Sequence, residues 1–196
     1  YKGFIKKVKF AENEKYTHKV CVLYAPLYSS PKNHKKINIK LSFGSRIKIF
    51  EKNKKFWKFD KYWIKKSDLQ KINHKDNDIF FNIKKFVGVK YFWGGKNYKG
   101  IDCSGLVQIF INYNNKFCPR DAKDQLTYFK KKIILQNIKK NDLIFWKGHV
   151  AIALSKTKLI HAYGPLKKVV IMSLKKTIKR IYKTANLKVI GIRRIN

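Results

Sequence analysis

Three side chains of this sequence have the chemistry of nucleophilic catalysis. Cys103 lies in the run Asp102-Cys103-Ser104-Gly105-Leu106, and His149 and His161 follow far downstream in two apolar runs. A thiol nucleophile needs an imidazole that holds its proton and a third group that orients the imidazole. The sequence therefore predicts a cysteine hydrolase in which one histidine is the general base and the other orients it.

The predicted nucleophile lies at the start of a predicted helix. Four apolar residues after Cys103 share one helical face, namely Leu106, Val107, Phe110 and Ile111. A thiol in the first helical turn is near the positive end of the helix dipole, which favours the thiolate. Gly100 and Gly105 would let the backbone approach a substrate closely, and amides at the helix start are natural donors to an oxyanion.

Both histidines fall in a predicted sheet. Five apolar runs follow Asn141-Asp142, over residues 143–145, 150–154, 159–160, 169–171 and 189–192. The polar segment 155–158 is a turn signal, so His149 and His161 would be neighbours across a hairpin. A helix followed by a sheet predicts an α+β fold for this part of the chain.

The N-terminal part has a different pattern. Short strand-like runs between Tyr16 and Leu69 predict a small all-β barrel, with strands over 20–24, 37–41, 46–50, 56–59 and 62–64. Residues 70–77 are polar and lack periodicity, which is typical of a linker. From Asp78 to Gly88 the apolar spacing predicts another helix. We therefore expect two domains, 1–72 and 78–196.

The charge of the chain is strongly positive. There are 47 Lys and Arg against 11 Asp and Glu, a net charge of +36, which would suggest nucleic acid or another anionic partner. However, the lysines are spread from Lys2 to Lys188 and accompany an excess of Asn, Ile, Phe and Tyr, residues that share A/T-rich codons. We interpret the charge as compositional and expect no specific nucleic-acid partner.

Cysteine usage and hydropathy bear on the compartment. The three cysteines, Cys21, Cys103 and Cys118, do not form a disulfide framework, so a reducing compartment fits best. No run approaches the ~20 apolar residues of a membrane helix, and lysines interrupt residues 1–10 where a signal peptide needs an apolar run. These features favour the cytoplasm, although a chain that begins at Tyr1 leaves export open.

A metal site is an alternative use of the same side chains. One cysteine and two histidines with a water would resemble a catalytic zinc centre. Paired-ligand spacings such as CxxC or HExxH are absent from the sequence, so we expect no metal.

Six motifs in order resemble a known family. They are Tyr91-Phe92-Trp93-Gly94-Gly95, the run 100–108 around Cys103, the run 119–125 that begins Pro119-Arg120-Asp121, the run 141–146, Gly148-His149-Val150 and Ile160-His161-Ala162. They resemble NlpC-type papain-like cell-wall cysteine peptidases, closest to the dipeptidyl-peptidase VI type, whose members cleave γ-D-glutamyl-diamino-acid bonds of peptidoglycan peptides. The N-terminal part, through residues 25–31 and 43–44, is similar to the bacterial SH3-like domains that precede such peptidases.

The resemblance implies a role for each matching residue. Cys103 would be the nucleophile, His149 the base, His161 the orienting group, and Tyr91 would lie beside the oxyanion. Four further residues would contact the substrate: Trp93, Asp102, Ser104 and Asp121. No cofactor would be required, and the partner would be a peptidoglycan-derived peptide with a free N-terminal L-Ala that Asp121 meets.

Further details of the resemblance concern the surroundings of these residues. The SH3-like domain would crowd one end of the groove. Its candidate wall is Trp57, Tyr62 and Trp63, and the alternative is that all three belong to the core of the barrel. Arg120 would be a structural partner of a carboxylate.

Two positions depart from the family pattern. Ala122 stands where a serine is usual, and Asn141 stands where a glycine is usual, although Asn tolerates positive φ. Neither position belongs to the predicted set of Cys103, His149 and His161. Separately from these two positions, two rival functions stay open. One is a vestigial peptidase that binds nucleic acid or cell-wall polymer, and the other is acyl transfer or amidase action by the same thiol.

Overall fold

The computed structural model describes residues 15–32 and 36–195, and its N-terminal part is all-β, as predicted. A three-stranded antiparallel sheet has the order β4 (Arg46–Ile47), β1 (His18–Val20), β8 (Leu69–Lys71). A five-stranded sheet has the order β3 (Lys36–Ser42), β2 (Tyr24–Tyr28), β7 (Tyr62–Lys65), β6 (Phe56–Phe59), β5 (Glu51–Lys52). Among the described residues the strand pairing does not close into a barrel, so the predicted barrel is present only as two open sheets.

These two sheets enclose one small apolar core. Its buried members come from both sheets and include Val20, Leu27, Ile47, Ile64 and Leu69. The predicted strand over 20–24 is wrong in detail, because β1 ends at Val20, residues 21–23 bend, and β2 begins at Tyr24. The bend carries the chain from the first sheet to the second, and the Cys21 amide donates to the Asp68 carbonyl across it.

The helix predicted after Asp78 is also wrong. Residues 79–82 form turns, and a short 3-10 helix, η2 (Ile83–Phe86), follows. The buried side chains are Phe80, Ile83 and Phe86, which are three residues apart, and three residues per turn is the repeat of a 3-10 helix. The apolar spacing therefore identified the buried face but favoured the wrong helix type.

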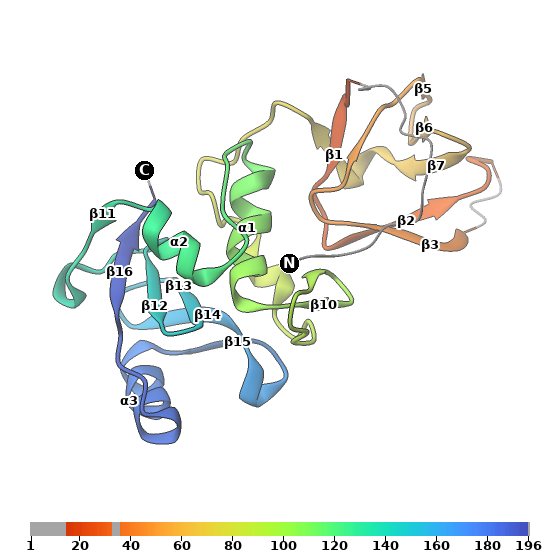
Figure 1. Ribbon diagram of the computed structural model, residues 1–196. Coiled ribbons are helices and arrows are strands. Elements are labelled where there is room, and N and C mark those ends of the chain that lie inside the picture. Colours follow the sequence, from red (N-terminus) through yellow and green to blue (C-terminus); the bar gives the residue numbers. More distant parts are fainter. Residues whose placement is uncertain (1–14, 33–35, 196) are drawn as a thin grey trace, which may run out of the picture.

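The C-terminal part has the predicted α+β fold (Figure 1). A six-stranded antiparallel sheet has the order β11 (Lys131–Lys132), β16 (Gly191–Arg194), β12 (Leu143–Trp146), β13 (His149–Ala153), β14 (Lys158–Tyr163), β15 (Lys168–Ser173). The helices are α1 (Cys103–Tyr113), α2 (Ala122–Tyr128) and α3 (Leu174–Ala185). Smaller elements are the β9–β10 hairpin (Lys96–Asn97, Gly100–Ile101) and the 3-10 turns η1 (Lys66–Asp68), η3 (Leu135–Asn137) and η4 (Gly164–Leu166).

Both faces of this sheet are covered, and the strand sequences show it. Along β12, Leu143 and Phe145 pack in a cluster with α1, whereas Ile144 and Trp146 pack in a second cluster with α3. Successive side chains of a strand point to opposite faces of the sheet, so this alternation is expected for a strand with an apolar layer on each side. In Figure 1, α1 stands between the sheet and the N-terminal part of the chain, and α3 lies away from α1.

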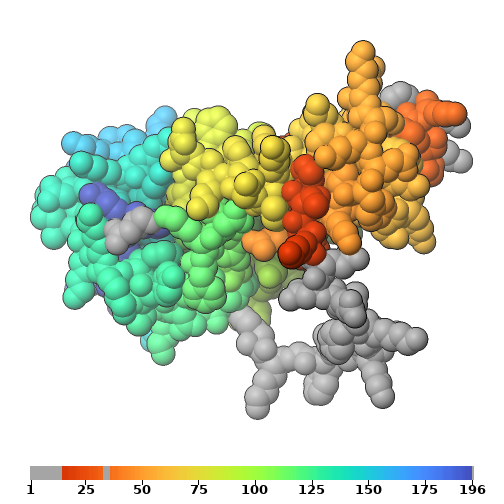
Figure 2. Space-filling model, turned by 90° about the horizontal axis from the view of Figure 1, so that it is seen from above, coloured from red at the N-terminus to blue at the C-terminus, as the bar shows by residue number. Residues whose placement is uncertain are grey.

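The N-terminal part is docked onto α1. Phe43, between β3 and β4, stacks on Tyr113 with 4.5 Å between ring centroids and lies 4.8 Å from Phe110. Lys19 of β1 is buried, and its ammonium donates to the carbonyl oxygens of His74 and Tyr113. Figure 2 shows the yellow segment near residue 75 packed against both the red-to-orange N-terminal part and the green region of α1.

Within residues 15–32 and 36–195, no helix is long and apolar enough to cross a bilayer.

Candidate active site

Cys103 is the first residue of α1, as predicted. Asp102 caps this helix, because its Oδ1 accepts a hydrogen bond from the Gly105 amide at 2.7 Å. The Cys103 side chain is 7% exposed and reaches the wall of a cavity of about 190 Å³. The backbone N–H of Val150, the residue after His149, lies near enough to the sulfur to lower the pKa of the thiol. The thiol therefore lies at the start of β13, next to the predicted base.

Most of the predicted site residues line this one cavity. Its walls are formed by six of them together with three others: Tyr91, Trp93, Asp102, Cys103, Ser104 and Asp121, with Ala122, Lys123 and Gly148. They come from the loop before β9, the start of α1, the start of α2 and the turn before β13. Segments separated by up to 57 residues of sequence, from Tyr91 to Gly148, thus meet at a single opening.

The loop that carries Tyr91 and Trp93 is held at both ends. The Tyr91 amide donates to the Lys167 carbonyl at 2.8 Å, and the Gly94 amide donates to Asp102 Oδ2 at 2.7 Å. Tyr91 is half-buried, whereas Trp93 is 68% exposed at the cavity rim. An exposed indole on an anchored loop is suited to contact a ligand rather than to stabilise the core.

The glycines near Cys103 are required by close packing of the chain. A Cβ on Gly105 would lie 2.6 Å from the Gly95 carbonyl oxygen, and a Cβ on Gly100 would lie 2.6 Å from Phe92 Cβ. Real Cβ atoms do not approach so closely, so these positions admit only glycine. Gly100 and Gly105 therefore pack the loop against the helix start, and their closeness to a bound substrate stays a prediction.

Asp102 and Arg120 form the central ion pair of the site. Arg120 Nη2 donates to Asp102 Oδ2 at 2.6 Å and Arg120 Nη1 donates to Oδ1 at 2.9 Å, a bidentate geometry. The amides of Gly94 and Gly105 and the Ser104 hydroxyl also donate to this carboxylate. Arg120 is thus the structural partner that the sequence predicted, and five hydrogen bonds from the chain occupy the Asp102 carboxylate.

Ser104 is held by the same network. Its hydroxyl accepts from Arg120 Nη1 at 2.9 Å, and its carbonyl accepts from the Gln125 side chain at 2.9 Å. Asp121 precedes α2 and is half-buried at the cavity wall. Asp102 and Asp121 both line the opening, and the five hydrogen bonds to Asp102 come from the chain itself.

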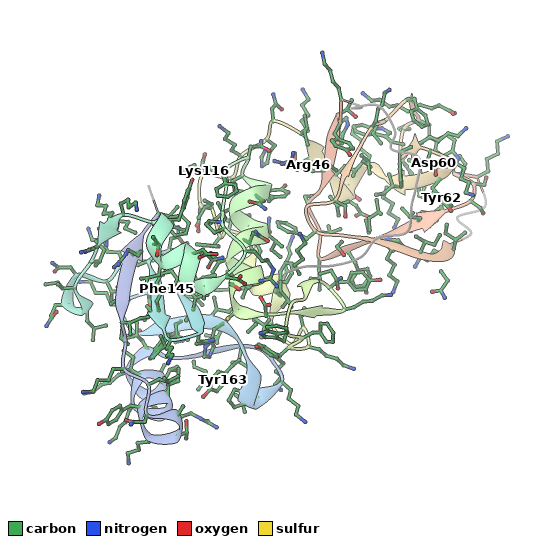
Figure 3. The ribbon with its side chains drawn as sticks, viewed as in Figure 1. Arg46, Asp60, Tyr62, Lys116, Phe145 and Tyr163 are labelled. Atoms are coloured by element: carbon green, nitrogen blue, oxygen red, sulfur yellow. The ribbon has the colours of Figure 1, made fainter. Side chains whose placement is uncertain are left out.

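The two histidines are joined directly. His149 Nε2 and His161 Nδ1 are 2.9 Å apart, so the hairpin of β13 and β14 brings them together as predicted. The His161 ring stacks on Tyr163 with 4.6 Å between centroids, and Tyr163 is labelled in Figure 3. His161 Nε2 lies 3.3 Å from Met172 Sδ on β15. Because Nε2 of His149 is engaged by His161, Nδ1 is the nitrogen left for the thiol.

The part of the chain that the structure describes contains no group of three or more His, Cys, Asp or Glu side chains placed to hold a metal ion.

Residues 88–187 match the NlpC/P60 family. The chain belongs to the NlpC/P60 family.

Curated relatives match either most of this chain or a shorter part of it. A γ-D-glutamyl-L-lysine dipeptidyl-peptidase of Bacillus subtilis is 27% identical over 91% of this chain, which spans 65% of that protein. A dipeptidyl-peptidase 6 of Lysinibacillus sphaericus is 39% identical over 39% of this chain and 28% of that protein. The chain therefore spans less than two thirds of these curated relatives.

A solved structure supports the fold. An NlpC/P60 family protein from Bacillus cereus superposes with a TM-score of 0.73 at 23% identity, covering 91% of this chain and 62% of the other. At this identity the likeness shows the fold, the mixed α/β papain-like fold of the family.

Burial determines the charge state of the site. Desolvation raises the pKa of the Cys103 thiol to about 11 and lowers the pKa of His149 to about 4. Desolvation, with the nearby His149, lowers the pKa of His161 to about 3. All three groups are neutral at pH 7 when each is taken singly. The backbone amides of Cys103 and Ser104 at the helix start lower the pKa of the thiol, as predicted, but desolvation raises it by more, so the helix start alone does not make Cys103 a thiolate.

Sequence reasoning missed three residues near the site. Lys123 and Gly148 line the cavity, and Met172 contacts His161. Gly148 has a φ of +74°, so the glycine before His149 was a usable signal for a tight turn. Asn141 also has a positive φ, +73°, as its replacement of the usual glycine predicts. Met172 carried no sequence signal, because only the strand register brings it to His161.

Proposed function

We propose that this chain is a cysteine peptidase that hydrolyses γ-D-glutamyl-diamino-acid bonds of peptidoglycan-derived peptides. The observation that carries the proposal is the position of the Cys103 sulfur near the Val150 amide. Val150 follows His149, whose Nε2 is hydrogen-bonded to His161 Nδ1. A buried thiol beside a linked imidazole pair, in a cavity lined by the start of a helix, has the components of acyl transfer through a thioester. The names of the relatives support the substrate class.

The proposed reaction has two halves. The Cys103 sulfur attacks the γ-carbonyl carbon of D-Glu while His149 Nδ1 takes the thiol proton. That proton then passes to the leaving amine of the diamino acid as the C–N bond breaks and a thioester forms. Water attacks the thioester, again losing a proton to His149, and the free carboxylate and thiol are restored. No cofactor takes part in these steps.

The neutral resting site fits this general-base mechanism. Burial disfavours a lone thiolate and a lone imidazolium, but proton transfer from Cys103 to His149 creates both at once. Their mutual attraction offsets part of the desolvation cost in a low-dielectric site. His161 accepts the His149 Nε2–H and so stabilises the imidazolium. Amides at the start of α1, and Tyr91 at the cavity wall, are the proposed oxyanion donors.

The proposed substrate contacts are Trp93, Ser104 and Asp121. Trp93 offers an exposed aromatic face at the rim, and Asp121 offers a carboxylate for the ammonium of an N-terminal L-Ala. Asp102 lines the cavity, yet the chain's own donors occupy both of its carboxylate oxygens. We therefore assign Asp102 to holding the Trp93 loop on α1 rather than to binding the peptide.

The N-terminal part, residues 1–72, is proposed to be SH3-like and to restrict which peptides enter the peptidase domain, residues 78–196. Its predicted aromatic wall is wrong, because Trp57, Tyr62 and Trp63 do not line the cavity and pack within the N-terminal part instead. Besides Phe43, which stacks on α1, Tyr24 of this part contacts the peptidase domain, with its ring 5.1 Å from that of Tyr98 between β9 and β10. We interpret the +36 charge as compositional, without a specific nucleic-acid role.

A defined set of muropeptides tests the proposal. The wild type should release L-Ala-D-Glu from L-Ala-γ-D-Glu-diaminopimelate or its L-Lys counterpart, as read by mass spectrometry, and should cleave the N-acetylated peptides far more slowly. Cys103→Ala should abolish cleavage, and Cys21→Ser, a half-buried thiol outside the cavity, should not. A folded wild type that cleaves none of these peptides but binds anionic polymer in a salt-sensitive way would support the binding-module alternative.

A further inference from the structure

Met172 is the only methionine of the sequence, and it ends the chain of contacts that begins at His149. It lies on β15, which pairs with β14 so that Leu159 faces Met172 and His161 faces Val170. This register places Met172 Sδ 3.3 Å from His161 Nε2, while His161 Nδ1 is 2.9 Å from His149 Nε2. Both nitrogens of the His161 ring therefore have a partner within the fold.

The sulfur determines which of these nitrogens carries the proton. A thioether has lone pairs and no hydrogen, so it can accept a hydrogen bond but not donate one. His161 is 1% exposed, so no solvent water substitutes for that partner, and its neutral ring holds one proton. Stacking on Tyr163 covers the face of the ring and does not distinguish its two nitrogens. The favourable arrangement has the proton on Nε2, donated to Met172.

The position of the proton on His161 determines the position of the proton on His149. With the proton on His161 Nε2, Nδ1 of the same ring is an acceptor, and His149 must donate from its own Nε2. Neutral His149 then has its lone pair on Nδ1, the nitrogen left for the thiol. The opposite arrangement would set a lone pair of His161 against the sulfur and put a proton on His149 Nδ1, where it could not accept the thiol proton.

We propose that Met172 is a positioning residue that fixes the tautomers of His161 and His149, and thereby keeps the base ready to accept a proton. The catalytic consequence rests on the proposed function, whereas the position of the protons does not. Nothing in the motifs around Cys103, His149 and His161 assigns such a role to the strand after His161. The new feature is that the thioether sulfur of Met172 accepts a hydrogen bond from the buried nitrogen of the histidine pair, His161 Nε2.

Two variants of different polarity test this role. Met172→Leu keeps an apolar side chain and removes the acceptor, whereas Met172→Gln can present a carbonyl oxygen to His161 Nε2. Ile171→Leu, at an exposed neighbour on β15, is the control. Long-range 15N–1H spectra of histidine-labelled protein report the tautomer of each ring directly, and peptide cleavage reports kcat and KM.

The expected results separate a hydrogen bond from packing. The wild type and Met172→Gln should show the Nε2–H tautomer at both rings. Met172→Leu should show a second tautomer and lose about fivefold to tenfold in kcat, the value of one hydrogen bond, with KM changed less than about twofold. An unchanged tautomer in Met172→Leu, or an equal loss of kcat in both variants, would overturn the proposal. If the wild type cleaves no peptide, the proposed function fails and the spectra still decide the proton positions.

Discussion

The Asp102–Arg120 pair allows a sharp test of how the site is built. Asp102→Asn keeps the shape of the side chain but replaces one acceptor oxygen with an amide nitrogen. If that nitrogen takes the Oδ2 position, it faces two donors, the Gly94 amide and Arg120 Nη2, which approach Oδ2 at 2.7 and 2.6 Å. Both donors would lose their acceptor, and the Arg120 guanidinium, only 21% exposed, would lose its counter-charge.

The magnitude follows from the burial of the pair. Removing one partner of a buried ion pair lowers the free energy of unfolding by about 3–5 kcal/mol. Because Arg120 is partly exposed, we expect Asp102→Asn to lose about 3 kcal/mol, the lower end of that range. For a domain of this size that loss corresponds to a fall in Tm of about 6–12 °C. Urea and thermal unfolding followed by circular dichroism measure it. Asp124→Asn, an exposed acidic residue of α2, is the matched control and should change stability by less than about 0.5 kcal/mol.

The same variant distinguishes the two roles considered for Asp102. If Asp102 only bound substrate, Asp102→Asn would raise KM and leave the unfolding transition where it is. A stability within about 1 kcal/mol of the wild type would refute the reasoning from the hydrogen-bond network.

Three further predictions concern the histidines and the glycine contact. His149→Ala should lose nearly all peptide cleavage, whereas His161→Asn should keep a measurable fraction, because an amide oxygen can accept the His149 Nε2–H; equal losses would contradict the assignment of the base. The folded pKa of His161, about 3, lies below its ordinary value of 6.5, so the unfolded chain binds more protons between these values and stability falls as the pH drops below 6.5. Between pH 7 and pH 5, His161 alone should lower the free energy of unfolding by about 2 kcal/mol, as measured by urea unfolding. His161→Asn should lack this part of the pH dependence, and a variant whose stability depends on pH as the wild type's does would contradict the burial argument. Gly105→Ala should destabilise the fold by about 2 kcal/mol or more, because its Cβ would meet the Gly95 carbonyl oxygen, whereas Gly164→Ala, whose Cβ would make only ordinary 3.7 Å contacts, should be nearly neutral in the same assay.

The spacing of apolar residues along the sequence was enough to predict most of the helices and strands that carry the site. The apolar spacing after Cys103 predicted α1, and the alternating runs with the turn at 155–158 predicted the β13–β14 hairpin that joins His149 to His161. Both depend on contacts between residues close in sequence, where side-chain direction follows directly from the helical or strand repeat. The same reasoning failed at residues 79–86, because a spacing of three suits more than one type of helix.

The tertiary structure alone decided the chemistry of the individual groups. Whether Cys103 is a thiolate depends on its desolvation, and whether Asp102 can contact a substrate depends on Arg120, 18 residues away, and on the loop amide of Gly94. The tautomer of His161 depends on Met172, which only the β14–β15 register brings within reach. Charge state and hydrogen-bond direction are set by all neighbours within a few ångströms, and the sequence specifies those neighbours only once the chain has folded.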